Sequence, residues 1–286
     1  MKISVSSYSF AQYIRAGKMT TIDAVKKAHE IGLSAVEFTA FPAECADKKS
    51  LAEEIRSEAE KYNMVIPCYA VGANMVLETK DEDDAEYEKI CRELDIAKIL
   101  GAKVFRHDAS FKLPTWCKSF YQALPKMADN IRRITEYGEK LGIKTTIENH
   151  GFICQDSTRV EQIVAAVNHP NFGLLVDMGN FMCVDENSAL AVSRCAPYAF
   201  HVHAKDFYFH PFDTDENIEG CFKTRACNYL KGSVIGEGVV PVKQCLSILQ
   251  RAGYDGFLGI EFEGSEDCID AISKGFNNLN RYLEEL

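Results

Sequence analysis

Four stretches of the sequence run from apolar residues straight into acidic or imidazole side chains. The stretches are Ile143 to Gly151, Phe172 to Asn180, Tyr198 to Asp206 and Gly256 to Gly264. Each begins with the β-branched and other apolar residues that are typical of a buried strand. The polar side chains of interest, one from each stretch, are Glu148, Asp177, His203 and Glu261. The pattern predicts four strands that end at one place.

Three carboxylates and one imidazole form a hard, oxygen-rich ligand set with a single nitrogen. Such a set suits Mn²⁺, Mg²⁺ or Co²⁺ and is compatible with Zn²⁺. Any one of these side chains, taken alone, could instead cap a helix or form an ordinary ion pair. All four at equivalent strand positions favour a shared cation, because crowded carboxylates repel one another without one. We therefore expect one divalent metal ion, bound by Glu148, Asp177, His203 and Glu261.

The elements that must position these groups alternate along the chain. Further strands are expected at residues 2–8, 35–39, 65–70 and 103–106. Amphipathic helices are expected at residues 20–31, around 51–59, at 83–100, 124–141, 157–167, 186–194, 242–251 and 268–283. Ser157 is the predicted N-cap of its helix. Gly32, Gly101, Gly142 and Gly253 each end a helix shortly before an apolar strand.

This order predicts an α/β fold, a single (β/α)8 TIM barrel that spans residues 1–286. A doubly wound open sheet is the alternative. The barrel is favoured because only a closed sheet brings the ends of so many strands around one centre. Residues 206–240, rich in aromatic and basic side chains and in glycine, are expected to form a long loop over the strand ends.

Composition narrows the classes of partner. The net charge of −10 repels phosphate backbones and anionic membrane surfaces, so we expect neither nucleic acid nor membrane as a partner. The sequence has neither a signal-peptide pattern at its start nor a run of about 20 apolar residues. Its 11 cysteines, odd in number and without a Cys-x-x-Cys pair, are typical of reduced thiols and predict a cytoplasmic location. A homo-oligomer is compatible with the sequence.

Five motifs make the sequence similar to a known family. They are Ile147 to Gly151, Asp177 to Asn180, His201 to Asp206, Ile235 to Gly238 and Gly259 to Glu261. The chain resembles the xylose isomerase-like TIM barrels, in particular the sugar phosphate isomerase/epimerase family with its ketose 3-epimerases and inosose dehydratases. The resemblance implies that Glu148, Asp177, His203 and Glu261 bind one divalent metal, often manganese. It also implies that Glu148 and Glu261 act as an acid/base pair on the two faces of a bound sugar.

Two departures from the family patterns limit this resemblance. The related apurinic-site endonucleases carry additional histidines, but Asn180 stands in the Asp-x-x-His position and no histidine precedes Ile235 and Gly236. A DNA-repair function is therefore disfavoured, as it is by the net charge. The ketose 3-epimerases have an arginine six residues beyond the histidine ligand, whereas this chain has Phe209.

Other polar residues near the strand ends are candidates for catalysis or substrate binding. His150 is expected to act as an acid/base or to orient Glu148. The candidates for substrate binding are His107, Lys205, Asn180 and Arg225. For His107 and Lys205 the alternative is an ion pair with Asp108 or Asp206. We expect His201 to point away from His203, and Glu263 either to share the site or to reach solvent.

The expected function is divalent-metal-dependent isomerisation or epimerisation of a ketose, keto-sugar or sugar phosphate. Removal of a proton next to a carbonyl leaves an enediolate, which a bound metal stabilises while two carboxylates exchange the proton. The alternative is a dehydratase or lyase, in which the same first step is followed by loss of a β leaving group. A sugar-binding barrel without catalysis is a third hypothesis, disfavoured because binding alone does not call for two carboxylates at the metal.

Overall fold

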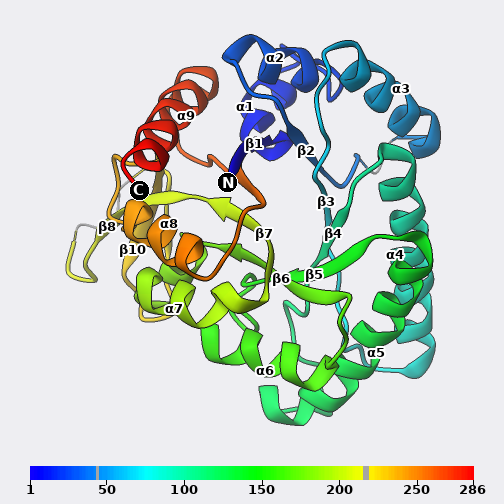
Figure 1. Cartoon of the computed structure of the whole chain (residues 1–286). Helices are drawn as coiled ribbons and strands as arrows, with labels where there is room; N and C mark the ends of the chain where they lie inside the picture. The colour runs from blue at the N-terminus through cyan, green and yellow to red at the C-terminus, as the bar shows by residue number, and fades with distance from the viewer. Residues whose placement is uncertain (43–44, 215–218) are drawn as a thin grey trace.

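The carboxyl ends of eight parallel strands meet at one side of a closed barrel (Figure 1). The computed structural model describes residues 1–42, 45–214 and 219–286. The barrel strands are β1 (Lys2–Ser6), β2 (Val36–Thr39), β3 (Cys68–Val71), β4 (Val104–His107), β5 (Lys144–Glu148), β6 (Phe172–Asp177), β7 (Ala199–Ala204) and β11 (Phe257–Ile260). Their order around the barrel is β1-β11-β7-β6-β5-β4-β3-β2, and β1 pairs with β2 to close it. The predicted single (β/α)8 barrel is confirmed.

Helices surround the barrel, and the longer ones bury apolar residues in its core (Figure 1). They are α1 (Ala11–Arg15), α2 (Asp23–Ile31), α3 (Lys48–Lys61), α4 (Lys80–Leu100), α5 (Phe120–Leu141), α6 (Ser157–Val167), α7 (Ser188–Cys195), α8 (Val242–Arg251) and α9 (Cys268–Glu284). Short 3-10 helices occur at Ser7–Phe10, Asn180–Val184 and Ala196–Tyr198. Gly32, Gly101 and Gly142 end α2, α4 and α5 in the left-handed region, as predicted.

Several helices begin at different residues from those predicted, because capping side chains set their starts. Thr79 and Glu82 form a reciprocal capping box, so α4 begins at Lys80. Ser119 caps α5, so this helix begins at Phe120 and not at the predicted residue 124. Pro125 therefore lies in the second turn of the helix and not at its start. The N-cap of α6 is Asp156, whose carboxylate accepts from the amide of Arg159, and not the predicted Ser157.

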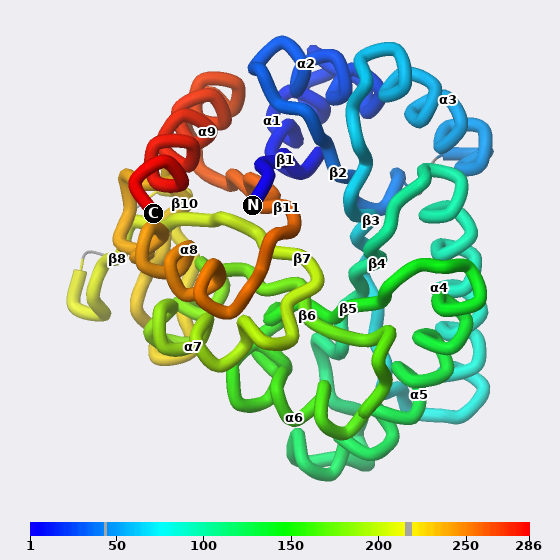
Figure 2. Tube along the Cα trace, viewed as in Figure 1, coloured from blue at the N-terminus to red at the C-terminus, as the bar shows by residue number. Residues whose placement is uncertain are grey.

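Residues 206–240 contain a small antiparallel sheet, so the prediction of one long loop is wrong for this segment. Strands β8 (Asp206–His210), β10 (Tyr229–Ser233) and β9 (Cys221–Lys223) pair in that order. Figure 2 follows this part of the chain, in yellow, at the left of the barrel. A side-chain carbon at Gly232 would lie 2.6 Å from the carbonyl oxygen of Glu263, so the sheet packs closely against the chain after β11.

The buried carboxylate of Asp206 fixes the turn that follows this sheet. It accepts hydrogen bonds from the amides of Phe207, Gly236, Gly238 and Val240 at 2.8 to 3.0 Å. Those bonds explain the Ile235 to Gly238 motif, since amides so close to the carboxylate leave no space for a side chain at Gly238. In the described parts of the chain, no helix is long and apolar enough to cross a membrane.

Candidate active site

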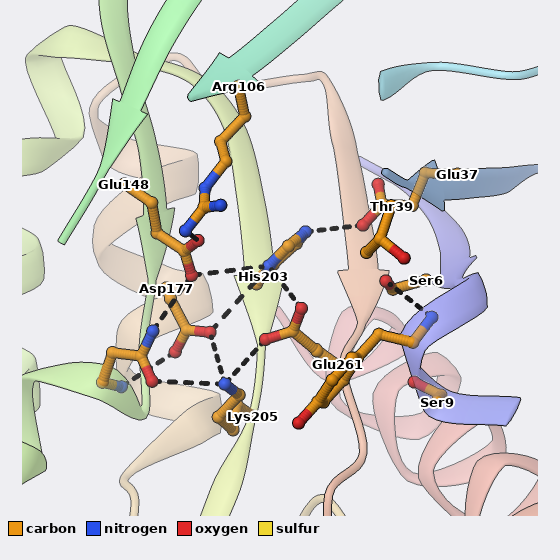
Figure 3. Close-up of polar contacts among 12 residues, drawn as sticks. Ser6, Ser9, Glu37, Thr39, Arg106, Glu148, Asp177, His203, Lys205 and Glu261 are labelled. Atoms are coloured by element: carbon orange, nitrogen blue, oxygen red, sulfur yellow. Dashed lines mark hydrogen bonds and ion pairs between the residues drawn. The ribbon is translucent and has the colours of Figure 1, made fainter. Parts of the chain in front are cut away.

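Four side chains from neighbouring strands converge at the carboxyl end of the barrel (Figure 3). Glu148 ends β5, Asp177 ends β6, His203 lies in β7 and Glu261 follows β11 directly. Each offers one ligand atom, and these atoms all lie within 4.8 Å of one another. The structure therefore brings together the four residues that the sequence analysis predicts as metal ligands.

The chain holds the Asp177 carboxylate in place through its backbone. The Asn149 side chain donates to the Asp177 carbonyl and accepts from the Asp177 amide, both at 2.9 Å, which ties the end of β5 to the end of β6. Asp177 Oδ1 accepts from the amides of Gly179 and Asn180 at 2.8 Å. These bonds occupy Oδ1 and leave Oδ2 to face the cluster.

Two atoms of the cluster are buried without a hydrogen-bond partner, and they face each other. His203 Nδ1 lies 3.9 Å from Asp177 Oδ2, and neither atom has a hydrogen-bond partner among the described residues, although Asp177 Oδ2 forms an ion pair with Lys205 Nζ at 3.5 Å. The same nitrogen lies 3.8 Å from Glu148 Oε1 and 3.5 Å from Glu261 Oε1. Buried polar atoms are normally satisfied, and one divalent cation among these oxygens and this nitrogen would satisfy both. The residues present therefore fit a metal ion of the hard, oxygen-preferring class.

The electrostatics of the cluster point the same way. Burial raises the pKa of the Asp177 carboxyl, and although Lys205 lowers it, the charges of Glu148 and Glu261 help to keep it raised. Burial lowers the pKa of His203, but Glu37 and Glu261 outweigh this effect and raise it well above its usual value. The His203 shift reflects the negative charge around it, which a cation would balance, whereas the Asp177 shift is mainly an effect of burial.

Glu37, the second residue of β2, was not among the predicted site residues. Its Oε1 accepts a hydrogen bond from His203 Nε2 at 2.5 Å, and its other oxygen bonds to His201 Nε2. Burial raises the pKa of Glu37, but the two imidazoles outweigh this and lower it to about 2. A single acidic residue within the apolar Val36 to Phe38 run was the available sequence signal.

The expectation that His201 points away from His203 is wrong. Residues two apart on a strand share a face, because side chains alternate with every residue. The two imidazole rings accordingly lie edge to face, with centroids 5.6 Å apart, and both contact Glu37.

Lys205 and Asn180, two predicted substrate-binding residues, lie within the cluster. Lys205 Nζ is 2.6 Å from Glu261 Oε2, and it donates to Asn180 Oδ1 at 3.2 Å. Asn180 Nδ2 in turn donates to Glu148 Oε1 at 3.0 Å. The ion pair of Lys205 is therefore with a site carboxylate and not with Asp206, the alternative partner considered above.

Arg106 reaches the site in place of its predicted neighbour His107. The buried Arg106 guanidinium pairs with Glu148, and its Nη2 lies 2.7 Å from Asp108 Oδ1. His107 points to the opposite face of β4, is fully buried, and bonds through Nδ1 to the Asp108 carbonyl at 2.9 Å. Burial lowers the pKa of His107 to about 4. His107 is thus set apart from the site, and we propose no substrate contact for it.

His150 lies at the edge of the cluster, with its side chain 40% exposed. Its Nδ1 is 2.9 Å from Asp108 Oδ1 and 3.1 Å from Arg106 Nη2. Burial lowers the pKa of His150, but the hydrogen bond to Asp108 and the charge of Glu148 together outweigh burial and raise that pKa. These contacts use Nδ1 and leave Nε2 without a partner among the described residues. The ring can therefore exchange a proton with a bound molecule.

Arg225, the remaining predicted substrate-binding residue, contacts neighbouring loops. Its guanidinium bonds to the Phe152 carbonyl and lies 3.3 Å from Asp156 Oδ2. It ties the segment between β9 and β10 to the start of α6, and the structure places it outside the lining of the central cavity.

A cavity of about 260 Å³ opens onto the cluster. Its polar lining comprises Tyr8, Thr39, Arg106, Glu148, His150, Asn180, His203, Lys205, Glu261 and Glu263. Glu263, left open by the sequence analysis, shares this lining and lies 3.5 Å from Lys205 Nζ. Tyr8 and Arg106 are further lining residues that sequence reasoning missed.

Fold and cluster together define a TIM barrel with a candidate ligand cluster at the carboxyl ends of its strands, where the active sites of TIM-barrel enzymes lie. The family model described as "Xylose isomerase-like TIM barrel" matches residues 25–285. The chain belongs to this family.

Individual relatives are distant. The chain is 25% identical over 139 residues to inosose dehydratase 1 of Bacillus cereus (strain ZK / E33L), across 48% of this chain and 46% of that protein. The chain thus spans about half the length of the curated relatives that it matches. The solved structure of an L-ribulose 3-epimerase has a TM-score of 0.73 at 13% identity, covering 99% of this chain and 95% of that one.

A third relative was solved with a metal ion. A xylose isomerase-like TIM barrel protein from Mycobacterium smegmatis, in complex with magnesium, has a TM-score of 0.71 at 15% identity, covering 98% of this chain and 96% of that one. At such identities the two solved structures establish the shared fold. Two of these three relatives, the inosose dehydratase and the L-ribulose 3-epimerase, are named as enzymes.

Proposed function

We propose that this chain is a divalent-metal-dependent isomerase or epimerase that removes a proton α to the carbonyl of a keto-sugar. The observation that carries the proposal is the pairing of Glu148 and Glu261 at one ligand cluster. The two carboxylates come from β5 and β11, which β6 and β7 separate in the barrel, and both approach His203 Nδ1. A substrate carbon between them would meet a carboxylate on each side, as reversal of its configuration requires.

The surrounding cations keep both carboxylates ready to accept a proton. Burial raises the pKa of Glu148, but the charge of Arg106 and the contact with His203 together outweigh burial and lower that pKa. Burial likewise raises the pKa of Glu261, but Lys205 and His203 together outweigh burial and lower that pKa well below its usual range. The ionised carboxylate on one side can therefore take the α proton, and the proton returned to the opposite face would come from the other carboxyl group in its protonated form. A divalent cation held by Glu148, Asp177, His203 and Glu261 would polarise the substrate carbonyl and stabilise the charge that develops on its oxygen.

We propose Mn²⁺ or Mg²⁺ as this cation. The ligand set is three carboxylate oxygens and one imidazole nitrogen, which suits both ions, and a relative of the same fold was solved with magnesium. The substrate that we propose is unphosphorylated, since both cations that line the cavity, Arg106 and Lys205, are already paired with carboxylates. We also propose a cytoplasmic enzyme, because all 11 cysteines are free thiols.

A second candidate is elimination, as in a dehydratase or a lyase of keto-glycosides. The specific observation in its favour is His150, whose Nδ1 bonds to Asp108 and whose Nε2 is left for the cavity. In that reaction a carboxylate takes the α proton, the C–H electron pair forms a C=C bond, and the β C–O bond breaks. The departing oxygen would take a proton from His150. The name of the inosose dehydratase relative fits this candidate.

Mass spectrometry in D₂O tests both candidates at once. Keto-sugars incubated with metal-loaded enzyme should return with one deuterium at the carbon next to the carbonyl. An epimerase or isomerase gives a product of otherwise unchanged mass, whereas elimination releases water or an aglycone. Turnover without deuterium uptake would contradict the removal of the α proton, which is the first step of both candidate reactions.

Two variants and a matched control locate the reaction. Glu148→Gln and Glu261→Gln should abolish deuterium uptake while retaining some metal, because an amide oxygen still coordinates but does not accept the proton. Glu136→Gln is the control, since this exposed carboxylate on α5 lies outside both the cavity and the ligand cluster. Equal loss in all three variants would show that charge alone, and not the Glu148 and Glu261 pair, carries the reaction.

A further inference from the structure

A second cavity, of about 290 Å³, adjoins the polar one. The two share part of their lining, namely His150, Asn180, Lys205 and Glu263. A molecule bound among the metal-ligand candidates can therefore extend past His150 into the second space without leaving the barrel mouth.

Three phenylalanine rings from separate parts of the chain line this second cavity. Phe111 lies between β4 and α5, Phe152 between β5 and α6, and Phe222 in β9. Their exposed fractions are 48%, 44% and 37%. Large apolar side chains are normally covered, and exposed ones that gather around a single cavity mark a binding surface.

The rings are held in position by specific contacts. Phe152 has a φ of 60°, in the left-handed region that residues other than glycine rarely adopt. Its amide donates to Gln155 Oε1 at 2.7 Å, and its carbonyl accepts from Arg225. Phe111 packs edge to face on His150, with centroids 5.1 Å apart, in space that a side-chain carbon at Gly151 would fill. A backbone conformation of this kind is retained where the surrounding structure imposes it, often at ligand sites.

The polar groups around these rings are largely engaged with one another. Gln155 bonds to the Phe152 amide and to the Asn180 carbonyl, and the Asn180 side chain bonds to Glu148 and Lys205. A second sugar ring would need donors and acceptors for its hydroxyl groups, whereas an apolar ring needs only the three phenyl faces.

We propose that the second cavity binds an apolar ring attached to the keto-sugar, so that the substrate is a keto-glycoside with an aromatic aglycone. This inference rests on the proposed function for the sugar half of the ligand. The sugar would occupy the polar cavity and the aglycone the space between Phe111, Phe152 and Phe222, with His150 at the junction.

Calorimetry with a matched pair of ligands tests the proposal. The probes are the methyl and phenyl β-glycosides of 3-keto-glucose, titrated into enzyme saturated with Mn²⁺. The phenyl glycoside should bind about ten-fold more tightly or better, because the aromatic ring leaves water. Phe222→Ala and Phe152→Gly should each reduce that ratio by about three-fold or more. Glycine is used at position 152 because it adopts the positive φ without strain.

Tyr121→Ala serves as the control, since Tyr121 is a 67% exposed aromatic residue on α5 outside both cavities. It should keep the wild-type ratio. Equal affinities for the two probes, binding of neither, or a ratio that survives loss of both rings would overturn the proposal. Deuterium uptake is measured on the same samples. Deuterium uptake without a preference for the phenyl glycoside would contradict only the second subsite. A preference for the phenyl glycoside without deuterium uptake would contradict only the proposed reaction.

Discussion

Glu37 shows how a residue outside the ligand set orients a ligand. By accepting the Nε2 hydrogen of His203, it keeps that proton on the side of the ring away from the cluster and leaves Nδ1 facing the carboxylates, where it would coordinate a bound cation in place of a proton. By bonding to His201 as well, it has both of its oxygens engaged and is itself fixed in orientation.

We predict that Glu37→Gln weakens metal binding about 10- to 100-fold, because the amide no longer stabilises this orientation of His203. Titration calorimetry with Mn²⁺ measures the change, and circular dichroism confirms that the variant is folded. Glu263→Gln is the control and should bind metal like the wild type. Unchanged affinity in Glu37→Gln would mean that the barrel alone orients His203.

His107 gives the protein an acid-sensitive site in its core. Burial favours the neutral imidazole and lowers the pKa from 6.5 to about 4. Above pH 6.5 His107 is neutral in both the folded and the unfolded chain, and the folded state keeps its full stability. As the pH falls from 6.5 towards 4, His107 takes up a proton readily only in the unfolded chain, so the free energy of unfolding decreases.

We predict that His107→Gln removes about 3 kcal/mol of pH dependence from the free energy of unfolding over this range. Urea unfolding at a series of pH values measures it, and the quantity compared is the slope, because the variant will also differ in absolute stability. His29→Gln, at an exposed site on α2, should reproduce the wild-type slope. Parallel curves for all three proteins would contradict the assignment to His107.

Among the secondary structure elements, those with strong local signals were predictable and those set by distant contacts were not. The start at Val242 and the end at Arg251 of α8, and the left-handed glycines after α2, α4 and α5, follow from periodicity and from the conformational freedom of glycine. The β8-β10-β9 sheet was missed because its turns and register depend on Asp206 and on packing against Glu263, which are remote in sequence.

The same distinction applies to the site. The four ligand candidates follow strands, so their convergence could be predicted from strand ends alone. The roles of Arg106 and Glu37 could not be predicted, because they depend on which face of β4 and of β2 points inward. They also depend on distant partners: Arg106 pairs with Glu148, about 40 residues away, and Glu37 bonds to His201 and His203, about 165 residues away.

The turn at residues 234–240 depends on one carboxylate. Asp206→Ala leaves four amide donors without their acceptor, and we predict a loss of about 3 kcal/mol in the free energy of unfolding. Asp206→Asn should lose roughly half as much, since Oδ1 still accepts from Phe207 and Val240. Urea unfolding measures both.

The control is Asp213→Ala, at an exposed position of the same segment, which should leave the free energy of unfolding unchanged. An equal loss in this variant would show that the segment tolerates no change of charge.

At the scale of the whole molecule, the ligand cluster links four of the eight barrel strands. A cation bound there stabilises only the closed barrel, because the unfolded chain does not assemble the four ligands. We predict that Mn²⁺ at about 100 times its dissociation constant stabilises the protein by about 2.7 kcal/mol and raises Tm by about 5 °C or more. Scanning calorimetry with metal and with chelator measures the shift. Asp177→Asn should show little of it, and a similar Tm in metal and chelator for the wild type would contradict a metal bound at the cluster.

The seam between β1 and β11 has a consequence for how the chain reaches this state. Ser9 bonds through its hydroxyl to the Ile260 carbonyl and the Phe262 amide, 251 and 253 residues away. During synthesis one edge of β1 therefore stays unpaired until β11, the last strand of the barrel, has left the ribosome. Contacts so distant in sequence are slow to form. Since Glu261 follows that last strand, the complete ligand set is assembled only when the seam closes, and metal capture would report the final step of folding.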